Sequence, residues 1–278
     1  MNDEEYSDIL ISQAKNSSKP GIHAYLTWLY KEVEFSLKGN LILEVGAGAG
    51  LSSNFMSSEK VLRTDYLPWK IPGVQGAIDA QQLPFSDNSF DSAFALDAVH
   101  HIPNPGKAIS ELCRVVRPGG KVVIVEPFVS YLSFLPYKLF HNEKTTWNYS
   151  LPTNGVRETK SASDGEQAIL QSIIDRNLQI KGLEIPKSKR VFLSIRYISP
   201  FSFFATGGLG SPFPTPKFMI DVMIGIERLL PRLLMKLISA RQILVIDIQP
   251  DIGVGLPGNC LTIDLKIVGK SIPQRLMD

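Results

Sequence analysis

The chain has 278 residues, of which 44% are hydrophobic and 20% are charged, and its formal net charge at pH 7 is +2. A chain of this length can bury a large core, either as one sizeable α/β domain or as two small ones. The small net charge and the lack of any dense stretch of Lys and Arg argue against a nucleic-acid partner.

The first half of the chain alternates short β-rich runs with helical or turn segments. In "NPGKAISELCRVVRPGG", apolar residues recur at helical spacing, and Pro118-Gly119-Gly120 is expected to stop the helix. The neighbouring runs are too continuously apolar to alternate, which predicts a parallel sheet with helices on both faces. These predicted strands are Asn40 to Val45, Lys60 to Thr64, Val74 to Ile78, Phe90 to Leu96 and Lys121 to Val125.

The chain after Phe128 is richer in aromatic residues, Ser and Pro. The runs "KRVFLSIRYI" and "RQILVIDIQ" are typical of strands. Between them, "FMIDVMIGIERLLPRLLMKLIS" predicts one amphipathic helix with a kink at Pro231. We expect its apolar residues to pack on the sheet, although the basic residues of its polar stripe leave a peripheral membrane contact open.

The stretch "LILEVGAGAG", residues 41–50, places Gly46, Gly48 and Gly50 directly after a predicted strand. A glycine-rich turn there puts bare backbone at the carboxyl edge of a parallel sheet, where α/β folds bind ligands. The dinucleotide fingerprint requires its third glycine three positions after the second, which here is Leu51, so nicotinamide binding is disfavoured. The glycines alone are also compatible with a turn that is simply tight.

Acidic residues lie at the ends of three successive predicted strands. Glu44 lies in the first strand, Asp65 follows the second about 20 residues later, and Asp79 ends the third. An acid at the position of Asp65 can accept hydrogen bonds from both hydroxyls of a ribose, and Asp79 can accept one from an adenine amino group. Each acid alone is compatible with a solvated strand end, but the three together indicate a nucleoside site.

The stretch "LPFSDNSFDSAFALDAVHHIPNPGKAISELCRVVRPGGKVVIVEPF", together with "EVGAGAG", resembles the class I S-adenosylmethionine-dependent methyltransferases, in particular their small-molecule branch. The resemblance covers residues 40–128. Outside that block, "DYLPW" and "SPFSFFATGG" are similar to a bacterial subgroup of these enzymes with unassigned acceptors. The resemblance implies S-adenosylmethionine as the cofactor and S-adenosylhomocysteine as its product.

The same resemblance implies the cofactor contacts. The three glycines would bound the methionine end, Asp65 would hold the ribose, and Leu96 and Asp97 would lie near the sulfonium. Asp79 and Ala80 would hold the adenine, and Tyr66 would be either a platform for that base or an ordinary surface aromatic. The full predicted cofactor set is Glu44, Gly46, Ala47, Gly48, Gly50, Asp65, Tyr66, Asp79, Ala80, Leu96 and Asp97.

The resemblance further implies an α/β, doubly wound, Rossmann-like seven-stranded sheet, mostly parallel with the last strand antiparallel. We expect one methyltransferase domain over residues 1–250. Its parts are an N-terminal helical lid (1–39), a cofactor-binding half (40–128), an acceptor-side insert (129–216), and a closing helix and strand (217–250). The tail, residues 251–278, matches no part of the pattern and has no predicted role.

The candidate catalytic residues are histidines and acids near the expected site. A sulfonium methyl group is already activated, so the protein has mainly to align the acceptor and exclude water, and no metal is needed. A hydroxyl acceptor would also need a base with a pKa near neutrality. His100 and His101 follow the fourth predicted strand and are either a base or structural residues. His141 and Glu143, in "KLFHNE", are either a base with its orienting carboxylate or a solvated helix end.

Two further polar residues have less direct roles. His23 belongs to the expected lid, and Glu126 ends the fifth predicted strand, where it can bind either an acceptor hydroxyl or nearby amides. The aromatic residues between 128 and 216 either line an apolar acceptor pocket or pack the insert on the sheet.

The favoured function is methyl transfer to a small or lipid-like acceptor, on oxygen. The alternatives are a catalytically silent S-adenosylmethionine-binding protein and, less favoured, an NAD-dependent oxidoreductase. Cys113 and Cys260 lack metal-ligand spacing, and the acidic "MNDEEYSDIL" is unlike a signal peptide. Every long apolar run is interrupted before the roughly 18 residues that a membrane span requires. We therefore predict a cytoplasmic protein without a metal or a transmembrane helix.

Overall fold

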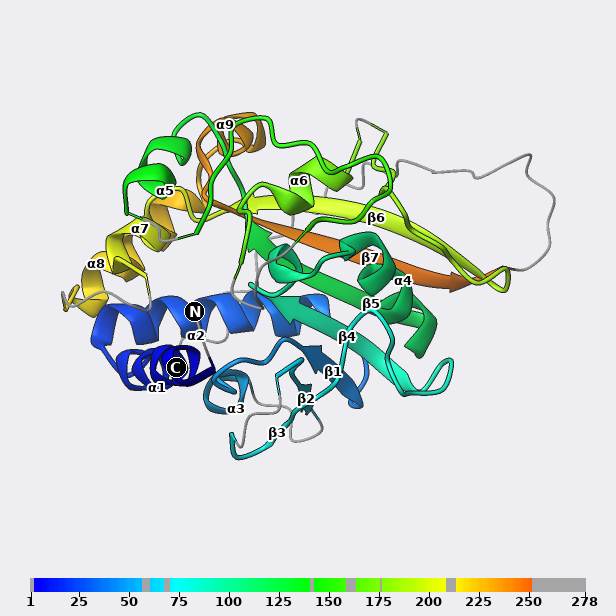
Figure 1. Cartoon of the computed structure of the whole chain (residues 1–278). Coiled ribbons are helices and arrows are strands. Elements are labelled where there is room, and N and C mark those ends of the chain that lie inside the picture. The colour runs from blue at the N-terminus through cyan, green and yellow to red at the C-terminus, as the bar shows by residue number, and fades with distance from the viewer. Residues whose placement is uncertain are drawn as a thin grey trace.

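The computed structural model describes residues 3–56, 61–67, 71–140, 143–158, 164–175, 177–208 and 214–251. These residues form a seven-stranded sheet with helices on both faces (Figure 1). The strands are β1 (Ile42–Val45), β2 (Val61–Thr64), β3 (Val74–Gln75), β4 (Phe90–Leu96), β5 (Val116–Pro127), β6 (Lys189–Ile198) and β7 (Arg241–Pro250).

The helices precede, separate and follow these strands. The short 3-10 helix η1 (Val99–His101) lies directly after β4. The α-helices are α1 (Asp3–Asn16), α2 (Pro20–Ser36), α3 (Ser52–Phe55), α4 (Pro105–Val115), α5 (Phe134–Phe140), α6 (Ile169–Ile173), α7 (Ser202–Thr206), α8 (Lys217–Glu227) and α9 (Arg232–Ile238).

The order of the strands in the sheet is β3-β2-β1-β4-β5-β7-β6. The pairs from β3 to β5 are parallel, and β7 is antiparallel to both β5 and β6. The predicted sheet, mostly parallel with its last strand antiparallel, is therefore confirmed. Because β1 to β5 run the same way, the residues that follow them gather at one edge, on the left of the sheet in Figure 1.

Alternate residues of the central strands enter two separate cores. In β5, Val123 and Val125 pack with α2 and α8, whereas Val122 and Ile124 pack with α4 and α6 on the opposite face. A strand buried on both faces needs apolar residues at nearly every position, which explains the continuous apolar runs in the sequence.

The α4–β5 connection differs from its prediction. Asn104 caps α4 by accepting a hydrogen bond from the amide of Lys107, and Pro105 opens the helix. The helix ends at Val115, and β5 begins at once and contains Pro118-Gly119-Gly120. The helix therefore ends before Pro118, as predicted, but these three residues lie within β5, which begins earlier than the predicted strand. The sheet accommodates them where the register between β4 and β5 shifts, as a bulge does.

The amphipathic segment after residue 216 is two helices. Helix α8 ends at Glu227, and α9 begins directly after Pro231. Pro231 has no backbone N–H to donate within a continuous helix, which favours a break here. The prediction of one kinked helix is therefore wrong. Ile220, Ile224 and Met235 are buried. Most other apolar side chains of α8 and α9 are exposed, so the expected packing of this segment on the sheet is also wrong for that face.

Within the described ranges, no helix is both long enough and apolar enough to cross a bilayer. Asp251 donates its amide to the carbonyl of Ser188 at 2.8 Å, and the remainder of the predicted tail, residues 252–278, lies outside the described residues.

Candidate active site

The glycine loop after β1 needs its glycines for conformation. Gly46, Gly48 and Gly50 have φ angles of 68°, 50° and 68°, in the left-handed region that favours glycine. A Cβ at Gly46 would collide with the Cβ of Ala98, whereas one at Gly48 would meet a methyl of Leu10 at 3.5 Å. The bare backbone therefore lets the loop turn and lets it pack closely on the residues after β4.

Asp65 joins this loop to the ends of β2 and β3. Its Oδ2 accepts the amide of Gly48 at 2.8 Å, and its Oδ1 accepts the amide of Leu67 at 3.1 Å. Its backbone carbonyl accepts the amide of Ile78 at 2.9 Å. The side chain is buried, so this one residue fixes the relative positions of the three loops at the carboxyl edge.

Glu44 lies beneath the loop, in the buried strand β1. It accepts a hydrogen bond from the hydroxyl of Ser52, and the Nε of Arg63 is 3.7 Å from its Oε2. Burial raises the pKa of Glu44 to about 7, against the opposing effects of Ser52 and Arg63.

The remaining predicted cofactor contacts differ in their burial and hydrogen bonding. Asp79 accepts, at Oδ1, the amide of Gln81 at 2.8 Å and its side-chain nitrogen at 3.1 Å. Ala80 and Ala47 are buried, and Leu96 packs against the α2–α8 core. The side chain of Tyr66 is 61% exposed, as an open platform or an ordinary surface aromatic would be.

Asp97, directly after β4, contacts a residue that the sequence analysis missed. Its φ of 52° is left-handed, a conformation that Asp adopts more readily than most residues. Its Oδ1 accepts a hydrogen bond from Nη2 of Arg241, the first residue of β7. Arg241 is buried with its guanidinium 5.2 Å from the centre of the Phe203 ring, and its Nε has no hydrogen-bond partner among the described residues. A cation at the start of a strand that contains the apolar run Ile243 to Ile246 was the available signal.

His100 lies between two carboxylates. Its Nδ1 is 2.5 Å from Oε2 of Glu126, and its Nε2 is 3.0 Å from Oε2 of Glu143. Burial by itself would lower the pKa of His100, but the two carboxylates outweigh it and hold the pKa well above its usual value. His100 is therefore an imidazolium at neutral pH and donates a hydrogen bond from each ring nitrogen.

His101 is the opposite case. Its Nε2 is 3.7 Å from Oε1 of Glu143, and its Nδ1 is buried and has no partner among the residues that the structure describes. Burial, followed by the charge of His100, lowers the pKa of His101 to about 3. The two rings, whose centroids are 4.1 Å apart, therefore carry one charge between them at neutral pH.

Residues of the insert complete this cluster. The side-chain amide of Gln167 donates to Glu143. The buried Arg157 donates through Nη2 to the carbonyls of His100 at 3.1 Å and His101 at 3.3 Å. No local pattern in the sequence singles out Gln167 or Arg157, because only the path of the insert over the sheet edge brings them to the histidines.

The structure describes only one of the other two histidines. His141 lies outside the described residues, although Glu143, its predicted partner, is described. His23 is exposed on α2, with its ring 5.0 Å from that of Phe55. Glu126 also accepts the amides of Ala98 at 3.1 Å and Val99 at 2.7 Å, which is one of the two roles expected for it.

The spacing of His100, His101 and Glu143 also bears on metal binding. One ligand atom each from His100, His101 and Glu143 lies within 4.8 Å of the others, which is a spacing a metal ion can accept. A cation there would have to replace the proton that His100 Nε2 directs at Glu143. The predicted absence of a metal stays a prediction.

The aromatic residues of the insert pack on one another in part. The ring of Tyr137 is fully buried against Phe203 and Phe204, and its hydroxyl donates to the carbonyl of Ala240 at 2.5 Å. Tyr131 and Phe134 instead contact Trp147. The packing role is therefore present at Tyr137.

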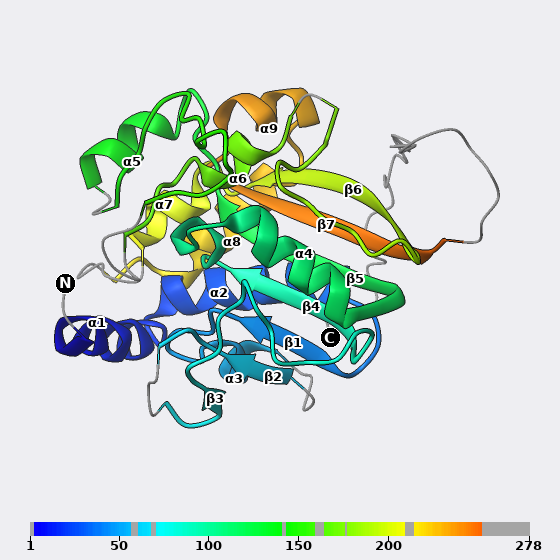
Figure 2. The same cartoon turned by 45° about the vertical axis from the view of Figure 1, so that its right-hand side comes forward.

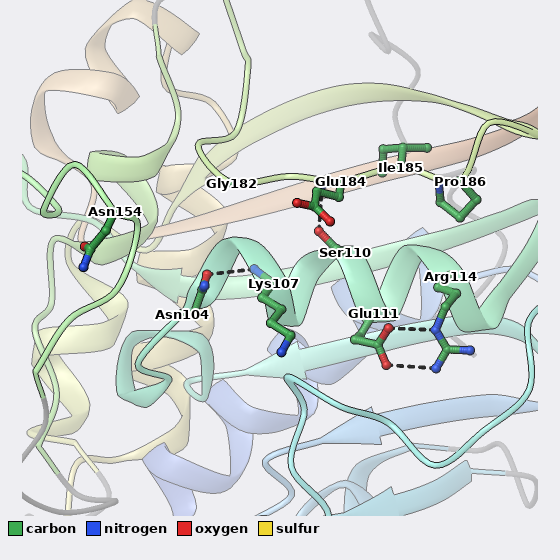
Figure 3. A pocket seen from close by; sticks show the side chains of 10 residues that line it. All are labelled: Asn104, Lys107, Ser110, Glu111, Arg114, Asn154, Gly182, Glu184, Ile185 and Pro186. Carbon is green, nitrogen blue, oxygen red and sulfur yellow. Dashed lines mark hydrogen bonds and ion pairs between the residues drawn. The ribbon is translucent and has the colours of Figure 1, made fainter.

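A groove of about 570 Å³ runs along α4 (Figure 3). Ser110 accepts the amide of Glu184 at 2.8 Å across it, and Glu111 and Arg114 pair on its wall. None of the predicted site residues lines this groove, so it is separate from the carboxyl edge.

The carboxyl edge has the donor and acceptor chemistry that S-adenosylmethionine requires. An ionised carboxylate can accept about four hydrogen bonds, and each oxygen of Asp65 accepts one described backbone amide, which leaves capacity for ribose hydroxyls. At Asp79, the contact from Gln81 to Oδ2 is long, at 3.3 Å, so that oxygen retains capacity for an amino group. The residues present therefore fit the cofactor.

Comparisons with known proteins agree with this geometry. Residues 43–124 match the family described as a methyltransferase domain. A demethylmenaquinone methyltransferase of Renibacterium salmoninarum is 32% identical over 39% of this chain and 49% of its own length. A phosphatidylethanolamine N-methyltransferase of Cereibacter sphaeroides is 34% identical over 33% of this chain and 52% of its own. The chain thus spans about half the length of these two curated relatives.

Among solved structures, the YcgJ protein of Bacillus subtilis is similar, with a TM-score of 0.38 and 17% identity over 82% of this chain and 99% of that one. The fold itself is read from the strand order and from the direction of β7. Residues 43–124 thus match a methyltransferase domain, which agrees with the resemblance to the class I S-adenosylmethionine-dependent methyltransferases and with S-adenosylmethionine as the methyl donor.

Proposed function

We propose that this protein transfers a methyl group from S-adenosylmethionine to an oxygen atom of a small or lipid-like acceptor. One observation carries the proposal. A left-handed glycine loop and the acids after β2, β3 and β4 share one edge of the sheet, and Asp65 ties the first three loops together. Hydrogen-bond acceptors spaced along such an edge suit the hydroxyl and amino donors of an adenosine.

Particular residues would hold the cofactor. Asp65 would accept the ribose hydroxyls, and Asp79 with the amide of Ala80 would hold the adenine. The backbone of Gly46 to Gly50 would face the methionine end, with Leu96 and Asp97 at the end of β4 beside it. When bound, S-adenosylmethionine supplies an activated methyl group, so the protein has to align the acceptor and keep water out.

The histidine cluster would manage the acceptor and its proton. His100, charged and hydrogen-bonded on both sides, would fix the turn after β4 and orient Glu143. His101 is neutral, and its Nδ1 has capacity for an acceptor hydroxyl. A base with so low a pKa is too weak to ionise an alcohol in advance, but an alkylated hydroxyl is a far stronger acid. His101 would therefore take the proton as or after the methyl group is transferred.

The acceptor class rests on the insert and on the relatives. By their names, the two relatives act on demethylmenaquinone and, at nitrogen, on phosphatidylethanolamine, so they support the acceptor class and not the choice of oxygen. In this chain, exposed aromatics of the insert, such as Tyr131 and Trp147, offer apolar surface near the site. We place the protein among enzymes of apolar acceptors for these reasons.

The test is an incubation of the protein with methyl-labelled S-adenosylmethionine and a lipid extract of the source organism. We expect label in the organic phase, and we expect the His101→Ala variant to lose most of that transfer while it still binds S-adenosylhomocysteine. Cofactor binding without transfer to any lipid, soluble metabolite or protein fraction would support the catalytically silent alternative instead.

A further inference from the structure

Two consecutive helices, α8 and α9, present apolar side chains to solvent. Leu229 between them is 84% exposed, Leu233 of α9 is 77% exposed, and Phe218 of α8 is 67% exposed. The other exposed apolar residues of this segment are Met219, Val222, Ile226, Leu234 and Leu237. Single exposed apolar residues are ordinary, but so many in two consecutive helices indicate a candidate interaction surface.

The turn before α5, and α5 itself, add to the same kind of surface. Tyr131 is 74% exposed, and Leu132, Leu135 and Leu139 are also exposed. In both views, α5 and α9 lie at the top of the molecule (Figures 1 and 2), and in Figure 1 α5, α7 and α8 lie on the left, the side toward which β4 and β5 run. We call the exposed apolar residues of 131–139 and 218–237 the apolar face.

The charged residues around this face are mainly basic. Lys138 of α5 and Arg232 and Lys236 of α9 are exposed. Two further exposed cations have acidic partners, since Lys217 pairs with Asp221 at 2.6 Å and Arg228 lies 3.7 Å from Glu32. The other acid of the segment, Glu227, is buried and accepts the amides of Phe201 and Ser202. Glu227 therefore does not contribute negative charge to the surface, and the exposed charged residues around the apolar side chains are mainly positive.

We propose that the apolar face is a docking surface for an anionic lipid bilayer. Leucine and phenylalanine side chains flanked by Lys and Arg are the composition of helices that lie in the interface of a membrane. Anionic headgroups attract basic residues that lie near the bilayer surface. The apolar and the basic residues of this segment would therefore both favour binding to an anionic bilayer.

Charge also decides between a bilayer and a second copy of the chain. A symmetric dimer through this face would place the same surface of both copies together, so Arg232 and Lys236 of each would approach like charges. A bilayer with anionic lipids offers the opposite charge. The docking does not depend on the proposed methyl transfer, because vesicles can be bound without a methyl donor.

The experiment is co-sedimentation of the full chain with vesicles of phosphatidylcholine alone and of phosphatidylcholine mixed with phosphatidylglycerol. We expect binding to the mixed vesicles that weakens with salt. Leu229→Ser with Leu233→Ser should lower the affinity on the order of 10-fold or more. Arg232→Gln with Lys236→Gln should lower affinity for the mixed vesicles only.

The matched control is Phe35→Ser, a change at an apolar side chain that is 72% exposed but lies at the end of α2, outside the apolar face. It should bind vesicles like the wild type, and circular dichroism should show that every variant is folded. Failure of the wild type to bind the mixed vesicles, or equal binding by the leucine variant, would overturn the proposal. So would a concentration-dependent dimer that the leucine variant abolishes in a protein that ignores vesicles.

Discussion

Glu126, near the end of β5, holds His100 of η1 through a contact of 2.5 Å between Oε2 and Nδ1, while its Oε1 accepts the amides of Ala98 and Val99. One carboxylate therefore fixes both the turn that follows β4 and the proton on the first histidine of the pair. Glu126 is a positioning residue in this scheme, because it acts through His100.

Glu126→Gln should destabilise the protein and slow transfer. The change removes a buried charge that His100 needs, at a cost of about 1–3 kcal/mol in the free energy of unfolding at pH 7. Urea denaturation measures that cost, and turnover should fall while the affinity for S-adenosylhomocysteine changes little. Glu111→Gln, which loosens Arg114 on α4, is the control that should affect stability but not turnover. A Glu126→Gln variant that is as stable and as active as the wild type would show that Glu126 does not position His100.

The pH profile of transfer should lack the inflection of an ordinary histidine. The pKa of His101 is lowered to about 3, so its ring is neutral at every pH above that value. We expect no step in rate near pH 6.5, the ordinary pKa of histidine. Rates measured across that range with wild type and His101→Gln check this. A step near pH 6.5 that His101→Gln abolishes would show that His101 titrates normally.

Glu44 should make stability depend on pH. Its pKa is raised from 4.5 to about 7 in the folded chain, so the folded state binds the proton more tightly than the unfolded state does. Its contribution is then fully present below pH 4.5 and is lost as the pH rises through 7. Relative to the wild type, Glu44→Gln should gain about 3 kcal/mol between those limits. Denaturation midpoints at acidic and alkaline pH measure the difference, and parallel pH curves for the two proteins would contradict it.

Removing metal ions should leave transfer intact. His100 already directs a proton from Nε2 at Glu143, and activation of the methyl group needs no Lewis acid in the proposed scheme. Dialysis against a chelator, followed by the transfer assay, checks this. Activity that falls and returns on addition of one divalent cation would assign His100, His101 and Glu143 to a metal.

The residues that could be predicted were those that belong to local sequence patterns. The strands and the mostly parallel sheet with its antiparallel last strand followed from apolar runs and from a family resemblance. The acids at Asp65 and Asp79 stood out because each follows a predicted strand or ends it. Arg157, Gln167 and Arg241 could not be placed, since they reach the site only through the path of the insert and the antiparallel return of β7.

The segment after residue 216 shows the other limit. Its periodicity predicts an amphipathic helix but does not say which element covers the apolar side. In the fold, Ile220 and Ile224 pack in the core that contains α2, Met235 is also buried, and most of the remaining apolar residues are exposed. Periodicity gave the helix type, whereas burial had to come from the tertiary structure.

Binding of S-adenosylhomocysteine at the carboxyl edge is tested most directly by calorimetry with the wild type and Asp65→Ala, with NAD as the competing ligand. We predict that the wild type binds S-adenosylhomocysteine, that Asp65→Ala binds it more weakly by about 1–3 kcal/mol because charged-acceptor hydrogen bonds are lost, and that NAD gives no heat. Binding of NAD in place of S-adenosylhomocysteine, or the same S-adenosylhomocysteine affinity in both proteins, would contradict the assignment of this edge.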